Sequence, residues 1–129
     1  MRDGEPFMTV TLMGGDMQAQ GHAQLLVNIL DLGANLQAAA DMARFRHSEI
    51  PNVLSLESSL YDLVGKRLEA MGHTVESING ENVGGVQAIM FVPAAAAEQP
   101  NVAGSVAKSV AGYYRSGSDF RKDGEAVGW

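Results

Sequence analysis

The stretch Phe7-Met8-Thr9-Val10-Thr11-Leu12-Met13 runs directly into Gly14-Gly15. Its β-branched and apolar residues predict a buried strand, and the glycine pair predicts a tight turn at the end of that strand. Apolar residues then recur at helical spacing over residues 18–32, with Asp16 in position to serve as the N-cap. The sequence therefore predicts a strand–turn–helix unit, with the helix deeply buried on one side.

Two more helices are predicted downstream of this unit. Residues 36–43 follow Asn35, a good N-cap residue, and include three consecutive alanines. Residues 60–71 carry apolar side chains on one helical face, and Ser59 with Asp62 resembles a capping box in which Asp replaces Glu.

Most of the predicted strands lie in the second half of the chain. They are residues 53–57, 73–78, 86–92 and 109–115. Asn79-Gly80 predicts a turn, Gly84-Gly85 predicts a close backbone approach, and residues 93–107 predict a loop. This element order favours an α+β fold, a mixed or antiparallel sheet covered by helices on one face, within a single domain spanning residues 1–129.

Composition excludes several classes of function. The 129 residues carry a net charge of −6 and no basic stripe, so nucleic acid is a poor candidate partner. No apolar run approaches the roughly 18 residues of a membrane span. The chain has no cysteine, and its three histidines lack metal-binding spacing, so neither a metal site nor a cofactor is expected.

Few groups in the sequence indicate a reaction or a bound ligand. Backbone amides at Gly14 and Gly15, next to a helix N-terminus, suit an anion or a developing oxyanion, although glycine pairs are also common in ordinary turns. Arg44, Arg46 and His47 could clamp a carboxylate, but capping of the preceding helix is the more frequent role of such residues.

Two further polar groups have plain structural interpretations. His22 could face the glycine turn, yet a solvent-facing or core-edge histidine is more common. Asp119 and Asp123 flank Arg121-Lys122, which indicates a turn stabilised by local charges and lacks the alternating oxygen ligands of a calcium loop.

Several short motifs together resemble the γ-glutamyltransferase (γ-glutamyltranspeptidase) family, specifically its small subunit. They are Pro6-Phe7, Met13-Gly14-Gly15-Asp16-Met17-Gln18, Gln20-Gly21-His22, Asn28-Ile29-Leu30-Asp31-Leu32-Gly33, Ala43-Arg44-Phe45-Arg46-His47, Leu68-Glu69-Ala70-Met71-Gly72-His73, Gly84-Gly85-Val86-Gln87-Ala88-Ile89 and Gly117-Ser118-Asp119-Phe120-Arg121. Each motif is weak alone, but their shared order makes a specific set that covers nearly the whole chain.

The resemblance implies part of an αββα N-terminal nucleophile hydrolase, in which a threonine freed by self-cleavage attacks a γ-glutamyl amide. The family's oxyanion-hole glycines map onto Gly14 and Gly15. Its nucleophile lies well upstream of that pair, so these 129 residues are expected to hold no nucleophile and to be inactive alone. The expected partners are the large subunit and the remainder of the small subunit.

The resemblance also bears on the substrate. Glutathione-acting members commonly carry Ser-Arg after the glycine pair, whereas Asp16-Met17 follows here, as in the divergent acylase-like branch. The alternative is a stand-alone, non-catalytic structural or binding module. Such a module would leave one sheet face uncovered, which predicts self-association, most simply as a homodimer.

Overall fold

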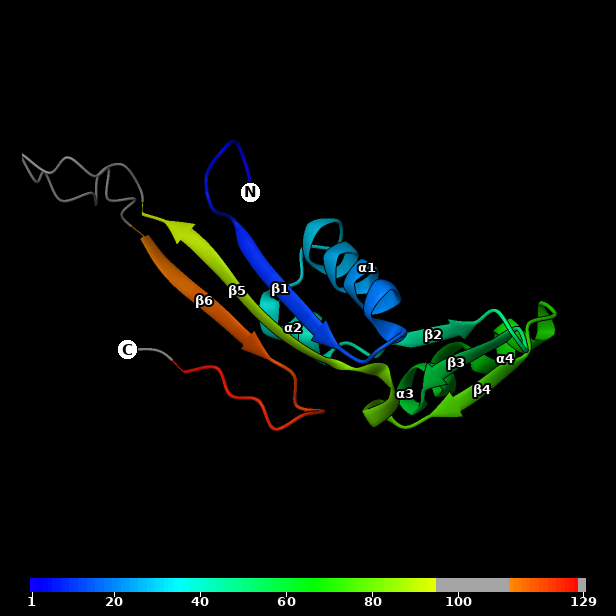
Figure 1. Cartoon of the computed structure of the whole chain (residues 1–129). Coiled ribbons are helices and arrows are strands. Elements are labelled where there is room, and N and C mark those ends of the chain that lie inside the picture. The colour runs from blue at the N-terminus through cyan, green and yellow to red at the C-terminus, as the bar shows by residue number, and fades with distance from the viewer. Residues whose placement is uncertain (95–111, 128–129) are drawn as a thin grey trace, which may run out of the picture.

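Two three-stranded sheets form the framework of the protein (Figure 1). The computed structural model describes residues 1–94 and 112–127. The first sheet is antiparallel, in the order β1 (Met8–Met13), β5 (Gly85–Pro93) and β6 (Gly112–Ser118). The second sheet contains β2 (Phe45–Ser48), β3 (Val53–Glu57) and β4 (Val75–Ile78), with β2 antiparallel and β4 parallel to β3. The predicted mixed α+β fold is confirmed.

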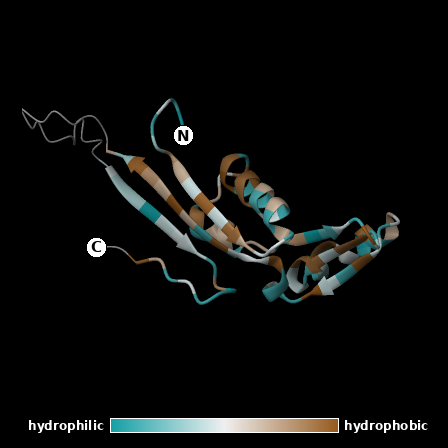
Figure 2. Ribbon diagram, viewed as in Figure 1, coloured by the Kyte–Doolittle hydropathy of each residue, from teal (hydrophilic) through white to brown (hydrophobic). Residues whose placement is uncertain are grey.

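The core lies between the first sheet and two helices, α1 (Met17–Leu30) and α2 (Leu36–Asp41). Along β1, brown hydrophobic bands alternate with near-white bands of intermediate hydropathy (Figure 2). The strand that the sequence predicts to be buried is therefore buried on one face only. The buried core side chains are Leu12, Val86 and Ala88 from the sheet, Met17, Leu25 and Ile29 from α1, and Leu36, Ala39 and Ala40 from α2, together with Val83. The helices therefore cover one face of this sheet, as predicted.

A glycine inside α1 sets how closely the helix approaches the sheet. A Cβ added at Gly21 would lie 2.4 Å from a methyl carbon of Leu12, which is itself almost fully buried. A side chain at position 21 would therefore force the helix away from β1.

The opposite face of the first sheet carries alternate residues of the same strands. Met13 and Ile89 are about half exposed there, at 53% and 46%. The tail comes back to this face, where residues 125–127 border a hollow shared with Thr9 and Thr11. The rest of this face has no covering layer in the part of the chain that the structure describes.

The helical segment after β3 departs from its sequence prediction in two ways. It consists of α3 (Ser58–Leu60), a π-helical turn η1 (Tyr61–Gly65) and α4 (Lys66–Ala70). The predicted helix over 60–71 is thus present but starts earlier. The predicted Ser59–Asp62 capping box is wrong: the N-cap is Glu57, which makes no side-chain capping bond because its carboxylate is held in ion pairs.

Strand β2 was not anticipated from the sequence. Its backbone is bonded by two glutamines of α1, one helical turn apart: Gln24 Nε2 donates to the Phe45 carbonyl at 2.8 Å and Gln20 Nε2 to that of His47 at 2.8 Å. The amides of these two strand residues donate back to the glutamine Oε1 atoms, at 3.0 and 2.8 Å. The glutamine side chains therefore make the hydrogen bonds to β2 that the backbone of a neighbouring strand would otherwise make.

The remaining caps and turns have mixed outcomes. Asn35 caps α2 as predicted, accepting from the amide of Ala38 at 2.8 Å. Asp16 is the N-cap residue of α1, as predicted, but its carboxylate makes no capping bond to the first turn. Asn79 caps a short 3₁₀ helix, η2 (Gly80–Val83), in place of a simple turn, because the chain passes here from one sheet to the other.

The last predicted strand, residues 109–115, is confirmed over residues 112–115, which belong to β6. The predicted loop over 93–107, apart from its first two residues, and the start of that strand lie outside the described residues. Within the described ranges, no helix combines the length and apolarity needed to cross a membrane.

Candidate functional site

The Gly14–Gly15 turn joins the end of β1 to the start of α1. Both glycines have positive φ, +149° and +56°, and both are exposed. Their carbonyls accept from the first amides of α1, from Met17 at 3.1 Å and Gln18 at 3.0 Å. Within the described residues, neither glycine amide donates to another protein group, so both remain available to an incoming acceptor.

This turn rests directly on a second glycine segment. A Cβ at Gly14 would lie 3.1 Å from the Cα of Gly84, and a Cβ at Gly84 would lie 2.3 Å from the carbonyl oxygen of Met13. Gly84 also has a φ of +79°, a conformation that favours glycine. The close backbone approach predicted from Gly84-Gly85 is therefore confirmed, and its partner is the Gly14 turn.

A buried arginine holds the other side of Gly84. Arg44 Nη1 donates to the carbonyls of Val83 and Gly84, each at 3.2 Å. The same guanidinium forms an ion pair with Asp119, whose Oδ2 also accepts from the amide of Val86 at 3.0 Å. Arg44 and Asp119 thus fix the backbone on both sides of the Gly84-Gly85 segment.

A second ion pair completes a closed cluster of four charges. Arg121 donates from Nε and Nη2 to the two carboxylate oxygens of Glu57, each at 2.7 Å. Its Nη1 donates to Asp119 Oδ1 at 3.0 Å, and Glu57 Oε2 accepts from the amide of Arg44 at 2.5 Å. We call these four residues, Arg44, Glu57, Asp119 and Arg121, the charge cluster.

The cluster is nearly inaccessible to water, and its formal charges sum to zero. Burial alone would raise the pKa of Asp119, but hydrogen bonds from Arg44 and from the amides of Arg121 and Val86 outweigh it and hold that pKa below its ordinary value. Burial alone would lower the pKa of Arg121, but its bonds to Glu57 and Asp119 raise it. Asp119 and Arg121 are therefore both charged at neutral pH.

The structure separates the three residues of the predicted basic cluster. Arg44 does cap α2, donating to the Ala40 carbonyl at 2.7 Å, but the carboxylate it binds is the chain's own Asp119. Arg46 Nε is buried without a partner among the described groups, and His47 Nε2 lies 2.9 Å from Asn52 Oδ1. These residues form no common clamp for an external ligand.

The other predicted polar groups also have internal partners. His22 Nδ1 lies 2.7 Å from the carbonyl of Gln18 in its own helix. Asp119 and Arg121 do form the predicted local charge contact, but both are buried within the charge cluster. The sequence singled out the tail twice, through its local charges and through the Gly-Ser-Asp-Phe-Arg motif, but sequence reasoning did not identify Glu57 as the partner of Arg121. No metal-binding group of acidic or histidine side chains occurs within residues 1–94 and 112–127.

Comparisons with known proteins agree with one another. The family model described as gamma-glutamyltranspeptidase matches residues 1–129. The glutathione hydrolase proenzyme of Escherichia coli (strain K12) is 31% identical over 93 residues, which cover 72% of this chain and 16% of that protein.

Solved structures show the same similarity in three dimensions. Cephalosporin acylase from Bacillus halodurans superimposes with a TM-score of 0.78 at 27% identity, covering 98% of this chain and 21% of that one. Gamma-glutamyltranspeptidase from Pseudomonas nitroreducens complexed with L-DON gives 0.71 at 26% identity, over 100% of this chain and 57% of that one. The T380A mutant of the Helicobacter pylori enzyme, at 22% identity and a TM-score of 0.74, shows likeness of fold. The chain spans 57% of two of these solved chains and 16% of the curated relative.

Proposed function

Since the chain belongs to the gamma-glutamyltranspeptidase family, we propose that it is the C-terminal portion of the small subunit of an N-terminal nucleophile hydrolase. In this proposal the Gly14–Gly15 turn supplies the oxyanion-hole amides. The reaction is the transfer or hydrolysis of a γ-glutamyl or related acyl amide. The large subunit and the remainder of the small subunit are its partners.

The observation that supports this role best is the way the turn is held. Both glycine amides are without a protein acceptor among the described residues, and the turn rests on Gly84. Gly84 is in turn bonded through its carbonyl to Arg44, which the buried Asp119 holds in place. Oxyanion stabilisation requires donors that are fixed before the charge develops, and this arrangement provides them.

The proposed step is an acyl transfer. A threonine hydroxyl attacks the amide carbonyl and loses its proton to a base, and the carbonyl oxygen becomes an oxyanion bound by the two glycine amides. Collapse of this intermediate expels the amine, which takes a proton, and leaves an acyl-enzyme ester. Water or an amino acid then attacks the ester, accepts the acyl group and restores the threonine.

The threonine is proposed to come from another part of the enzyme. Thr9 and Thr11 lie in the middle of β1, paired with Ile89 and Gln87 of β5, and Thr74 directly precedes β4. A nucleophile of this class needs a free α-amino group, which a residue inside a continuous strand lacks. The chain alone is therefore expected to be inactive.

The residues after the glycine pair bear on the acyl group. Met17 is almost fully buried in the core, so its side chain cannot reach a ligand at the turn. Asp16 is exposed and makes no capping bond, so it adds a negative charge beside the proposed oxyanion hole. The similarity to a cephalosporin acylase also supports an acyl amide other than glutathione as the substrate.

The experiment compares this chain with a longer protein that includes the upstream family sequence. We expect no turnover of a γ-glutamyl anilide by the isolated chain, and turnover of this or another acyl anilide by the self-cleaved longer form. In that form, Gly14→Ala should lower kcat about 100-fold by displacing an oxyanion donor. Gly72→Ala is the control, since Gly72 also has positive φ but open space around it.

Two results would contradict the proposal. A longer form that cleaves itself yet turns over neither γ-glutamyl nor other acyl amides would refute the activity. A Gly14→Ala variant that matches Gly72→Ala in kcat would refute the role of the turn.

The half-exposed sheet face favours a second candidate, a non-catalytic module that self-associates. This face carries Met13 on the outer strand β1, Ile89 on the central strand β5 and the exposed Tyr114 on the outer strand β6. All three side chains present apolar area to water. Burial of this face in a homodimer would remove that area from water. Light scattering at micromolar concentration tests it: a dimer mass that Ile89→Asp converts to a monomer mass supports this candidate, and a monomeric wild type rejects it.

A further inference from the structure

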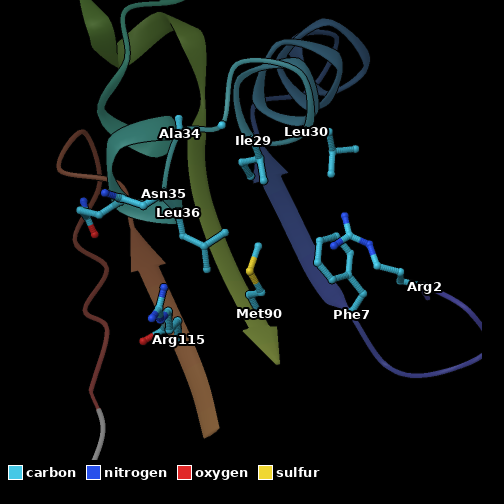
Figure 3. Close-up of a pocket in the computed structure, with 12 residues that line it drawn as sticks. Arg2, Phe7, Ile29, Leu30, Ala34, Asn35, Leu36, Met90 and Arg115 are labelled. Carbon is cyan, nitrogen blue, oxygen red and sulfur yellow. The ribbon is translucent and has the colours of Figure 1, made fainter. Parts of the chain in front are cut away.

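A large hollow opens at the other end of β1 from the glycine turn. It has a volume of about 660 Å³ and lies between the end of α1, the start of α2 and the helix-side face of the first sheet (Figure 3). Ile29, Leu36 and Met90 contribute apolar surface, and Phe7 borders one side. This volume falls within the range of pockets that bind small organic ligands, about 300–1,000 Å³.

The charged groups of this hollow are both cationic. Arg2 and Arg115 line it and no Asp or Glu does, although the chain as a whole carries a net charge of −6. Figure 3 shows Arg115 on one side of Met90 and the Arg2–Phe7 pair on the other. Neither arginine forms an ion pair with a described residue.

The two arginines differ in their surroundings. The Arg2 guanidinium is stacked 3.9 Å from the centroid of the Phe7 ring, and Asp3 and Glu5 line an adjoining hollow that both arginines border. The Nη2 atom of Arg115 donates to the hydroxyl of Tyr113 at 2.8 Å. Since a guanidinium has five N–H groups, Arg115 keeps donors for a ligand.

We propose that this hollow binds a small amphipathic carboxylate, with its headgroup on Arg115 and its apolar body over Met90 and Leu36. The apolar surface explains why the ligand carries a hydrocarbon portion, and two cations in a hollow whose own lining holds no Asp or Glu explain its negative charge. The inference is independent of the catalytic proposal, because it uses none of the residues of the glycine turn or the charge cluster.

The test uses three probes of equal chain length that differ in headgroup: decanoate, decanol and decyltrimethylammonium. Binding to the 129-residue chain is followed by calorimetry and by the chemical shift of the Met90 methyl group. Decanoate should bind at least about fivefold more tightly than decanol, and the cation should not bind. Hexanoate should bind at least about tenfold more weakly than decanoate, because it buries fewer methylene groups.

Substitutions locate the headgroup. Arg115→Gln should abolish the preference for decanoate over decanol while leaving decanol binding unchanged. Arg67→Gln removes the same charge from an exposed helical position that does not line the hollow and should change neither. Equal binding of all three probes, or an effect of Arg67→Gln equal to that of Arg115→Gln, would overturn the proposal.

A final arm uses the longer protein. Retained decanoate binding there, still sensitive to Arg115→Gln, supports a ligand site. If the longer protein no longer binds decanoate, the hollow is filled by the rest of the polypeptide, and the proposal of a ligand site is overturned.

Discussion

Arg121 and Glu57, which are 64 residues apart in the sequence, form a two-point ion pair with both nitrogen–oxygen distances at 2.7 Å. The pair ties the C-terminal tail to the end of β3, which belongs to the second sheet. Through Asp119, the same tail reaches the start of β5 in the first sheet. The short segment from Asp119 to Arg121 therefore contacts both sheets.

Loss of one member of this pair should strongly destabilise the fold. Glu57→Gln leaves the charge cluster with one uncompensated buried positive charge, because Arg121 then keeps only Asp119 as a charged partner, and we expect this to lower the free energy of unfolding by about 3–5 kcal/mol. Urea denaturation measures this loss. Glu69→Gln is the control, because Glu69 is half-buried and pairs with the exposed Lys66, and a glutamine there can still accept from the Tyr61 hydroxyl, so the urea midpoint should change little. Equal midpoints for the two variants would contradict the buried role of Glu57.

The charge cluster should make stability depend on acid pH. The pKa of Asp119 is lowered from its ordinary value of 3.8 in the folded state. Its contribution is therefore complete above that ordinary value and is lost as the pH falls towards the lower, folded-state pKa. The urea midpoint difference between wild type and Asp119→Asn should be constant from about pH 7 to about pH 5 and shrink below about pH 4. A difference that stays constant down to about pH 2 would show that the Asp119 charge contributes nothing.

Gly84 should tolerate no side chain. Gly84→Ala places a Cβ against the Met13 carbonyl and also carries the strain of positive φ. Gly72→Ala carries the strain alone, about 1–2 kcal/mol, since nothing lies within 4 Å of the position that its Cβ would take. We expect Gly84→Ala to lose roughly twice as much stability or more. Its amide NMR spectrum should also shift at Gly14 and Gly15, and unchanged shifts there would argue against contact between the two segments.

The glutamine contacts should protect β2 from exchange. Gln24→Leu removes the acceptor of the Phe45 amide, and that amide should exchange with deuterium about tenfold faster. Gln18→Leu is the matched control, because Gln18 lies on the same helix and its side chain is exposed. Slow exchange of Phe45 in the Gln24 variant would mean that another group protects this strand.

Local patterns predicted the parts of the fold that depend on adjacent residues. The strand β1, the helix α1 and the Asn35 cap each follow from a short stretch of sequence, and the structure confirms all three, although β1 is buried on one face only. The glycine pair also indicated the turn correctly, and the family resemblance, which the comparisons bear out, gave it a proposed role.

Long-range pairing explains what the sequence could not predict. Strand β2 depends on side chains of Gln20 and Gln24, which lie 27 and 21 positions away from their partners. Glu57 looked like the polar end of a strand, and its partner Arg121 looked like part of a surface turn. Charged residues are usually exposed, so burial of this set required knowledge of which segments meet.

The position of Asp119 and Arg121 along the chain also orders events during synthesis. A ribosome delivers the amino-terminal part first, so the glycine turn, Arg44 and Glu57 all emerge before either tail residue exists. Until the tail appears, the carboxylate of Glu57 and the guanidinium of Arg44 lack the ion-pair partners that they have in the finished fold. The glycine turn therefore gains its full set of supporting contacts only late in synthesis. A polypeptide that ends before residue 119 would contain the core residues but would lack the Arg44–Asp119 ion pair that supports the turn.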